Sequence, residues 1–142
     1  MKKSISVAMA LLLCVCATSF AQRKAPSAVT SAFNQKFSNA TNVKWDKENP
    51  HEYEASFTWN GKKYSANFSD KGEWLETESE VTFAQLPDKV QQTFTTSHKG
   101  TKVNGVAKIE TSKGTTKYEV EIKISGKTVE YFYDSNGTEL KK

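Results

Sequence analysis

Cysteine and histidine are scarce in this sequence of 142 residues, which has two of each. Both cysteines, Cys14 and Cys16, lie in an N-terminal segment that we expect to be removed. The remaining chain then has no disulfide and must be held together by its hydrophobic core. His51 and His98 stand far apart, without the paired spacing of metal ligands. No metal site and no cofactor are therefore expected.

No hydrophobic run is long enough to cross a membrane as a helix, which takes about 20 residues. The longest run covers residues 5–16, follows a Lys2-Lys3 pair and precedes Ser19-Phe20-Ala21, where small residues stand first and last. This order is typical of a secretory signal peptide. We expect residues 1–21 to be a signal peptide and the protein to be exported to the periplasm or the cell surface.

A lipid anchor is not expected on either cysteine. Lipoproteins carry a small residue directly before the acylated cysteine, whereas Leu13 and Val15 precede Cys14 and Cys16 here. The exported chain is therefore expected to have neither a lipid anchor nor a transmembrane segment.

Charge of one sign does not dominate the chain. The 20 basic and 16 acidic side chains give a net charge of +4, and without residues 1–21 the balance is 18 basic against 16 acidic, a net of +2. Domains that bind nucleic acid usually carry a clustered basic face, so no nucleic-acid partner is expected. The 37% apolar and 25% charged content is that of an ordinary globular domain.

An internal repeat organises the rest of the sequence. The first part of each copy matches at an offset of 61 residues, and the later part matches at an offset of 65. We predict two repeats, residues 22–81 and 82–142, with four extra residues in the second repeat at the turn containing Lys113-Gly114. The matching pairs are Pro26 and Pro87, Val29 and Val90, Phe33 and Phe94, Tyr53 and Tyr118, Glu54 and Glu119, Phe57 and Ile122, Gly61 and Gly126, Phe68 and Tyr133, Gly72 and Gly137, and Leu75 and Leu140.

Each repeat is expected to open with a short amphipathic helix. Val29, Phe33 and Phe37 recur at four-residue spacing in the first repeat, as Val90 and Phe94 do in the second. Helices of about ten to twelve residues are not stable alone in water. Each helix therefore needs a sheet on which to bury its apolar stripe.

Alternation of apolar and polar residues follows each helix and predicts an antiparallel meander. Residues 52–59 alternate, Asn60-Gly61 is a favoured pair for a tight hairpin turn, and residues 64–68 return. A further reversal at residues 70–72 leads into residues 73–81. The second repeat has matching strands and turns, and residues 43–45 and 106–110 are expected to add one strand to each repeat.

The predicted fold class is therefore α+β. Two tandem helix-plus-meander repeats would form one continuous or paired antiparallel sheet of six to eight strands, with both helices on one face. The other face is expected to be exposed and polar, with Phe132 as an apolar exception. Its predicted residues are Glu52, Glu54, Ser56, Thr58, Lys63, Ser65, Asn67, Glu119, Glu121, Lys123, Thr128, Glu130 and Phe132.

This combination of leader, duplicated unit, V-x-x-x-F helices and glycine-ended hairpins resembles the secreted PepSY-like proteins, also called β-lactamase-inhibitor-like. The resemblance covers the whole chain after the leader. It implies a tandem α+β domain in the periplasm or at the cell surface, with binding or inhibition as the activity. It supplies no catalytic residues to place on this sequence.

Paired carboxylates are the only residues that suggest an enzyme. Glu52 and Glu54, like Glu119 and Glu121, are two residues apart on a strand, which separates them by about 7 Å. Glycoside hydrolases place two carboxyl groups roughly 5–9.5 Å apart. Any charged strand face produces this spacing, so an enzyme acting on glycans or peptides is not expected.

The sequence thus favours an exported, non-enzymatic module that binds a protein or peptide through its open sheet face. Trp74 and Phe132 depart from the alternation and are candidate aromatic anchors. The alternative is a structural domain of the cell envelope whose partner, if any, pairs with an edge strand. The candidate surface comprises Trp74, Phe132, Glu52, Glu54, Lys63, Asn67, Glu119, Glu121, Lys123 and Glu130.

Overall fold

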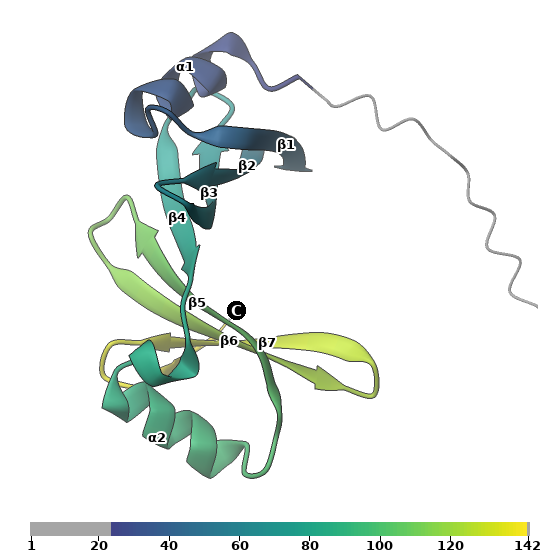
Figure 1. Ribbon diagram of the computed structural model, residues 1–142, viewed down its shortest axis with the longest axis vertical. Coiled ribbons are helices and arrows are strands. Elements are labelled where there is room, and N and C mark those ends of the chain that lie inside the picture. Colours follow the sequence, from purple (N-terminus) through teal and green to yellow (C-terminus); the bar gives the residue numbers. More distant parts are fainter. Residues whose placement is uncertain (1–23, 142) are drawn as a thin grey trace, which may run out of the picture.

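The structure is a computed structural model that describes residues 24–141 (Figure 1). The expected signal peptide, with Cys14 and Cys16, lies outside the described residues. In chain order the elements are α1 (Ser27–Lys36), β1 (Thr41–Asn49), β2 (Glu52–Trp59), β3 (Lys62–Ser69), β4 (Trp74–Glu80), the short 3-10 helix η1 (Phe83–Gln85), α2 (Asp88–Ser97), β5 (Val103–Thr111), β6 (Thr116–Ile124), β7 (Lys127–Asp134) and β8 (Glu139–Leu140).

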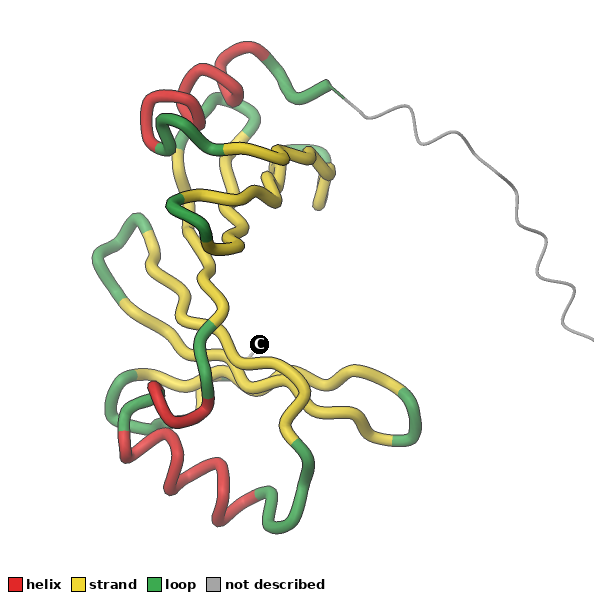
Figure 2. Tube along the Cα trace, in the orientation of Figure 1, coloured by secondary structure: helices red, strands yellow, loops and turns green. Residues whose placement is uncertain are grey.

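All eight strands form one antiparallel sheet, and their order in the sheet is their order in the chain. Figure 2 shows the strands in yellow. The α+β class, the two helices and the antiparallel sheet are confirmed, and the sheet is continuous rather than paired. The last strand is short, and β8 pairs with β7 only at Phe132↔Leu140 and Tyr133↔Glu139.

Two tight turns with the same backbone conformation close the hairpins β2–β3 and β6–β7. Asn60 and Gly61 have φ of 49° and 77°, and Ser125 and Gly126 have φ of 51° and 80°. Two successive positive φ angles give a turn whose twist matches that of the flanking strands. The turns therefore set the pairing register of both hairpins, with Trp59 opposite Lys62 and Ile124 opposite Lys127.

Both helices lie on the same face of the sheet. One row of paired residues crosses the sheet from β2 to β7, so its members share a face. Helix α1 contacts this face through Phe33 and Phe57, whose ring centroids are 4.9 Å apart, and α2 contacts it through Phe94 and Tyr131 at 6.5 Å. The row is Phe57, Tyr64, Ser79, Lys108, Tyr118 and Tyr133.

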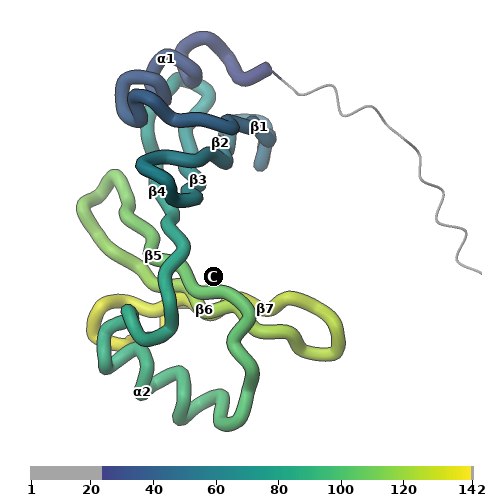
Figure 3. Tube along the Cα trace, in the orientation of Figure 1, coloured from purple at the N-terminus to yellow at the C-terminus, as the bar shows by residue number. Residues whose placement is uncertain are grey.

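The helices cover the two ends of the sheet and leave its middle bare (Figure 3). The apolar residues beneath α1 and α2 form two separate clusters. Between the clusters the helix-side face carries polar residues, including Ser79 opposite Lys108, and Thr77 opposite Glu110. The sheet backbone is thus continuous, whereas the hydrophobic core is divided in two.

Each helix is approached closely by a glycine that follows a strand. A Cβ atom on Gly72 would lie 2.6 Å from the carbonyl oxygen of Ala28, and a Cβ on Gly137 would lie 2.6 Å from that of Lys89. Both glycines also have positive φ, 85° and 80°. Glycine is therefore required at both places, because a side chain would push the helix away from the sheet.

Candidate binding surface

The polar residues predicted for the exposed sheet face lie together on the face opposite the helices. Strand pairing sets Glu54 opposite Asn67 in the first half, and Glu119 opposite Phe132 in the second. The ladder between β4 and β5 joins the two sets into one surface. We call this surface the open face.

The centre of the open face is hollowed between the two halves of the sheet. The hollow has a volume of about 390 Å³ and extends from β2 to β6. Its lining includes five glutamates and one lysine, which are Glu54, Glu78, Glu80, Glu119, Glu121 and Lys63. We refer to these carboxylates and their surroundings as the acidic hollow.

Small side chains on the central strands make the hollow possible. Ser56, Ser65, Gly105 and Ala107 are all part of its lining. A Cβ atom on Gly105 would lie 3.4 Å from the Cβ of Glu121, so glycine lets that glutamate lie close to the neighbouring strand. The glutamates, whose side chains are longer, surround these small residues.

Two glutamates of the hollow, Glu54 and Glu78, have a raised pKa. Partial burial, a hydrogen bond with Glu48 and repulsion from Glu48 and Glu78 raise the pKa of Glu54 to about 7. Burial also raises the pKa of Glu78, followed by repulsion from Glu76, Glu130 and Glu121. Close carboxylates with little access to water disfavour the charged form. Burial is the largest cause of the raised pKa for both Glu54 and Glu78.

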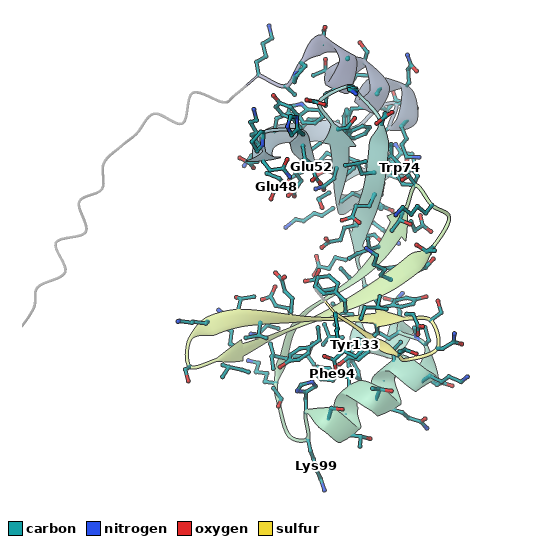
Figure 4. All side chains as sticks on the ribbon, turned by 180° about the vertical axis from the view of Figure 1, so that it is seen from behind. Glu48, Glu52, Trp74, Phe94, Lys99 and Tyr133 are labelled. Atoms are coloured by element: carbon teal, nitrogen blue, oxygen red, sulfur yellow. The ribbon has the colours of Figure 1, made fainter. Side chains whose placement is uncertain are left out.

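A network of hydrogen bonds holds the end of the open face near the β1–β2 turn. The Nδ2 of Asn67 donates to Oε1 of Glu52 at 2.7 Å, and Nδ2 of Asn49 donates to Oε2 of the same residue at 2.9 Å. Glu52 lies in this region with Glu48 (Figure 4). Two of the predicted surface residues, Glu52 and Asn67, are thus in direct contact.

Residues 16–60 and 51–141 match the family described as "Putative beta-lactamase-inhibitor-like, PepSY-like". The chain belongs to this family. The resemblance expected from the sequence is therefore confirmed. None of the curated proteins compared with the chain matches it.

Solved structures from Bacteroides share the fold of this PepSY-like chain. A BLIP-like protein of Bacteroides fragilis NCTC 9343 is 26% identical, with a TM-score of 0.67 over 83% of this chain and 84% of the other. A DUF2874 family protein of Bacteroides uniformis ATCC 8492 is 21% identical, with a TM-score of 0.73 over 83% and 88%. A protein of Bacteroides eggerthii DSM 20697, described as "putative periplasmic proteins", is 19% identical, with a TM-score of 0.74 over 83% and 87%.

Trp74 lies away from the open face of the PepSY-like chain, and its predicted place on that surface is corrected. Its ring packs against the first hydrophobic cluster, 3.6 Å below the Nζ of Lys36, and its indole N–H donates to Oγ1 of Thr77 at 2.8 Å. A register shift next to its partner Phe68 turns the side chain toward α1. Alternation along β4 could not reveal that shift.

The remaining predicted residues lie on the open face but differ in their distance from the hollow. Glu130 is opposite Glu121, and Phe132 is opposite Glu119, so both flank the hollow. Lys123 is farther out, near the tip of the β6–β7 hairpin, beside Ile124, whose side chain is 49% exposed. The lysine therefore contributes little to the centre of the surface.

The prediction of the open face missed the residues from the central strands. Glu78 and Glu80 alternate with Thr77 and Ser79 along β4, so their spacing could have placed them on one face. Gly105 carries no comparable signal, because its position depends on the β5–β6 register. The hollow thus combines residues that alternation can find with one that only the pairing of distant strands reveals.

Neither histidine belongs to the open face. His51 Nδ1 lies 3.0 Å from Oδ2 of Asp70, and this hydrogen bond is the main reason that the pKa of Asp70 is lowered. The ring of His98 packs on Tyr131, with the centroids 4.1 Å apart. Among residues 24–141, no group of three or more His, Cys, Asp or Glu side chains could hold a metal ion. Neither described α-helix is long and apolar enough to cross a membrane.

Proposed function

We propose that the protein is an exported, non-enzymatic binding module that engages a protein or peptide through its open face. The observation that carries this proposal is the placement of both helices on the other side of one continuous sheet. That placement leaves the open face without a helix across all the central strands. The family description supports an inhibitor-like role for such a module.

The shape of the open face supports a macromolecular partner over a small molecule. Small-molecule sites are usually enclosed and lined mainly by apolar and aromatic side chains. The hollow instead spans five strands and is lined mostly by polar and charged residues. A broad polar surface of this kind suits a partner that contacts several strands at once.

The proposed binding residues are those that surround the hollow, with Phe132 as the aromatic anchor. Its backbone pairs with Glu119 on one side and Leu140 on the other, which fixes the position of the ring on the open face. Aromatic residues of this kind often contribute most of the affinity of an interface. The other proposed residues are Glu52, Glu54, Lys63, Asn67, Glu119, Glu121, Lys123 and Glu130.

The place of action that we propose is the periplasm or the cell surface. The proposal relies on the signal-peptide pattern of residues 1–21. A relative of the same fold from Bacteroides eggerthii is described as periplasmic, which agrees with this location.

We further propose that the open face arose by duplication of one helix-plus-meander unit, with residues 22–81 and 82–142 as its copies. In support, Ala28 and Lys89, the helix residues approached by Gly72 and Gly137, are 61 positions apart, and the glycines are 65 apart. Their turns also match. Ser69 Oγ accepts from the N–H groups of residues 71 and 73, and Asp134 Oδ1 accepts from those of residues 136 and 138.

Capture of a partner by matched variants tests the binding function. Immobilised protein without residues 1–21 would be exposed to envelope extract, and the recovered proteins compared between variants. We expect Phe132→Ala to reduce recovery of a defined partner by about tenfold or more, because anchor residues contribute about 1–3 kcal/mol. Glu119→Gln on the open face should also reduce it. The control Gln92→Lys makes the same charge change on α2 and should leave recovery unchanged.

Equal recovery by wild type, Phe132→Ala and Glu119→Gln would contradict the role of the open face. Circular dichroism spectra and melting curves identify any variant that fails to fold. The inhibitor-like part of the proposal is tested by adding the purified protein to a purified serine β-lactamase. Dose-dependent loss of hydrolysis that Phe132→Ala abolishes would support it, and unchanged hydrolysis would remove that enzyme as the partner.

The structural alternative is supported by the free edge of β7. Strand β8 covers only Phe132 and Tyr133, so within residues 24–141 the segment 127–131 lies at the edge of the sheet. From the hairpin register, the N–H of Thr128 points outward and away from β6. Thr128→Pro should therefore abolish association if a partner adds a strand there, and should leave association through the open face unchanged.

A further inference from the structure

The acidic hollow differs in charge from the chain as a whole. Its lining includes five glutamates and one lysine, whereas residues 22–142 together have 18 basic and 16 acidic side chains, a net charge of +2. Negative charge is therefore gathered at one place on a chain that is basic overall. A concentration of one sign on a hollowed surface attracts groups of the opposite sign.

Three carboxylates of the hollow, those of Glu54, Glu78 and Glu121, form no ion pair with a basic side chain among residues 24–141. Ion pairs elsewhere join Lys108 to Glu110, Lys117 to Glu76 and His51 to Asp70. Glu54 and Glu78 are also partly buried, and the raised pKa of each reflects burial and repulsion by neighbouring carboxylates. Positive charge from outside would relieve this repulsion.

The distances between the carboxylates indicate whether the hollow suits a single metal ion or several separate positive groups. Glu54 lies on β2, Glu78 on β4 and Glu121 on β6. Neighbouring strands are about 4.8 Å apart, so β2 and β6 are separated by roughly 20 Å along a flat sheet. In the described part of the chain, no three acidic side chains converge closely enough to hold a metal ion. The distribution suits several separate positive groups on one chain.

The floor of the hollow also suits long basic side chains. Ser56, Ser65, Gly105 and Ala107 provide small side chains between the glutamates. The methylene groups of Lys or Arg can cover such a floor while the charged end reaches a carboxylate. Guanidinium groups also bind carboxylates with paired hydrogen bonds.

We infer that the acidic hollow docks a basic segment of the protein partner, with Lys or Arg side chains of that segment contacting Glu54, Glu78 and Glu121. This inference rests on the proposed function and specifies the chemistry of the partner. It commits to a polypeptide that presents several positive side chains at the spacing of every second strand, about 10 Å.

Binding of a synthetic peptide tests the inference directly. The probe is a fluorescently labelled decapeptide of alternating Arg and Ser, with an alternating Glu and Ser peptide as the negative probe. Fluorescence anisotropy with the folded protein lacking residues 1–21 should show binding of the Arg peptide only. Affinity should fall about tenfold or more as salt rises from about 0.05 to 0.3 M, because salt screens exposed charges.

Matched double variants locate the binding. Glu78→Gln with Glu121→Gln removes two charges from the hollow and should weaken the Arg peptide about tenfold, a typical loss for two partly exposed charge pairs. Glu73→Gln with Glu139→Gln removes the same charge elsewhere. Glu73 lies in the β3–β4 turn, and Glu139 is opposite Tyr133 on the helix side. This control should bind as wild type does.

Three results would overturn the inference. The first is equal weakening by both double variants, which would indicate attraction to overall charge only. The second is no binding of the Arg peptide at low salt by a folded protein. The third is calorimetric binding of Ca²⁺ at the hollow without binding of the peptide. If partner capture still depends on Phe132 in these cases, the proposed function stands and only the basic character of the partner is wrong.

Discussion

The half of the molecule under α1 and the half under α2 bury different kinds of side chain. In the first half, the ring of Phe33 packs against Phe37, Trp45, Phe57 and Phe68. The buried members of the second cluster include Val106, Val120 and Ile122, along with Leu86 and Val90. The same backbone arrangement therefore accepts an aromatic core or a largely aliphatic one, provided that the volume beneath the helix is filled.

The second half also buries two polar atoms without a hydrogen-bond partner among the described residues. They are the hydroxyl of Tyr133 and Nε2 of His98. The residues at the matching offsets in the first half are Phe68 and Phe37, which have no polar side-chain atoms. An unsatisfied buried polar atom costs about 1–3 kcal/mol. The comparison indicates that the second half is destabilised by buried polar atoms that the first half does not have.

The largest expected effect on stability concerns the feature that the two halves share, which is the close approach of a glycine to each helix. Gly72→Ala and Gly137→Ala should each lower the free energy of unfolding by about 2–4 kcal/mol, because each adds a backbone clash to an unfavourable positive φ. Gly61→Ala is the control, since Gly61 has φ of 77° but no atom within 4 Å of a Cβ. It should cost only about 1 kcal/mol. Urea denaturation measures all three, and a harmless Gly137→Ala would show that α2 is held more loosely than α1.

The next effect tests the difference between the two cores. Phe33→Leu removes a ring that contacts four aromatic side chains, whereas Phe94→Leu removes one that contacts Phe83, His98 and Tyr131. Both should destabilise the protein, by about 1–3 kcal/mol, and Phe33→Leu should cost more. The melting temperatures of the two variants show which substitution destabilises the protein more. The reverse order would mean that ring contacts do not set the stability of the first half.

A smaller effect of opposite sign is expected from Tyr133→Phe. Tyr133 is fully buried, and burial is the main reason that its pKa is raised to about 12. Removing the hydroxyl while keeping the ring should stabilise the protein by about 1 kcal/mol. Phe68→Tyr, the reciprocal change, should destabilise it by a similar amount. Denaturant midpoints that move in the same direction for both variants would contradict the comparison.

The smallest expected effect is a dependence of stability on pH that originates at Glu54. Its pKa is about 7 in the folded chain and 4.5 in the reference state, so between these values the folded protein binds more protons than the unfolded one. The contribution of Glu54 to stability therefore falls as pH rises from 4.5 to 7 and is constant above that range. Because the side chain is only partly buried, the change should stay near 1 kcal/mol or below.

Glu54→Gln isolates this contribution. The variant should melt at a higher temperature than wild type at pH 8, and the two should differ less at pH 4.5. Melting curves across this range provide the measurement. An equal difference at both pH values would show that the substitution acts through packing instead of charge.

Local patterns in the sequence were sufficient to predict most of the fold. The alternation of residues 52–59 and the Asn60-Gly61 pair define β2 and its turn, because both depend only on neighbouring residues. The four-residue spacing of Val29 and Phe33 likewise identifies the buried side of α1.

Features that depend on distant strands were harder to predict. Trp74 was misplaced because a register shift interrupts the pairing of β3 with β4. The hollow was not predicted as a site, since Gly105 and Glu78 meet there only through the pairing that joins the two halves. The two unpaired buried polar atoms, on Tyr133 and His98, also depend on tertiary packing and have no sequence signal.

The strictly sequential order of the strands has a consequence for how the chain acquires its structure. Most strands pair with the next segment to be made, so each hairpin closes a short loop at low entropic cost. Only the pairing of β4 with β5 must wait for α2 to be made. The chain can thus assemble progressively from its N-terminal side, and the β4–β5 ladder, which completes the open face, is the step with the longest loop to close.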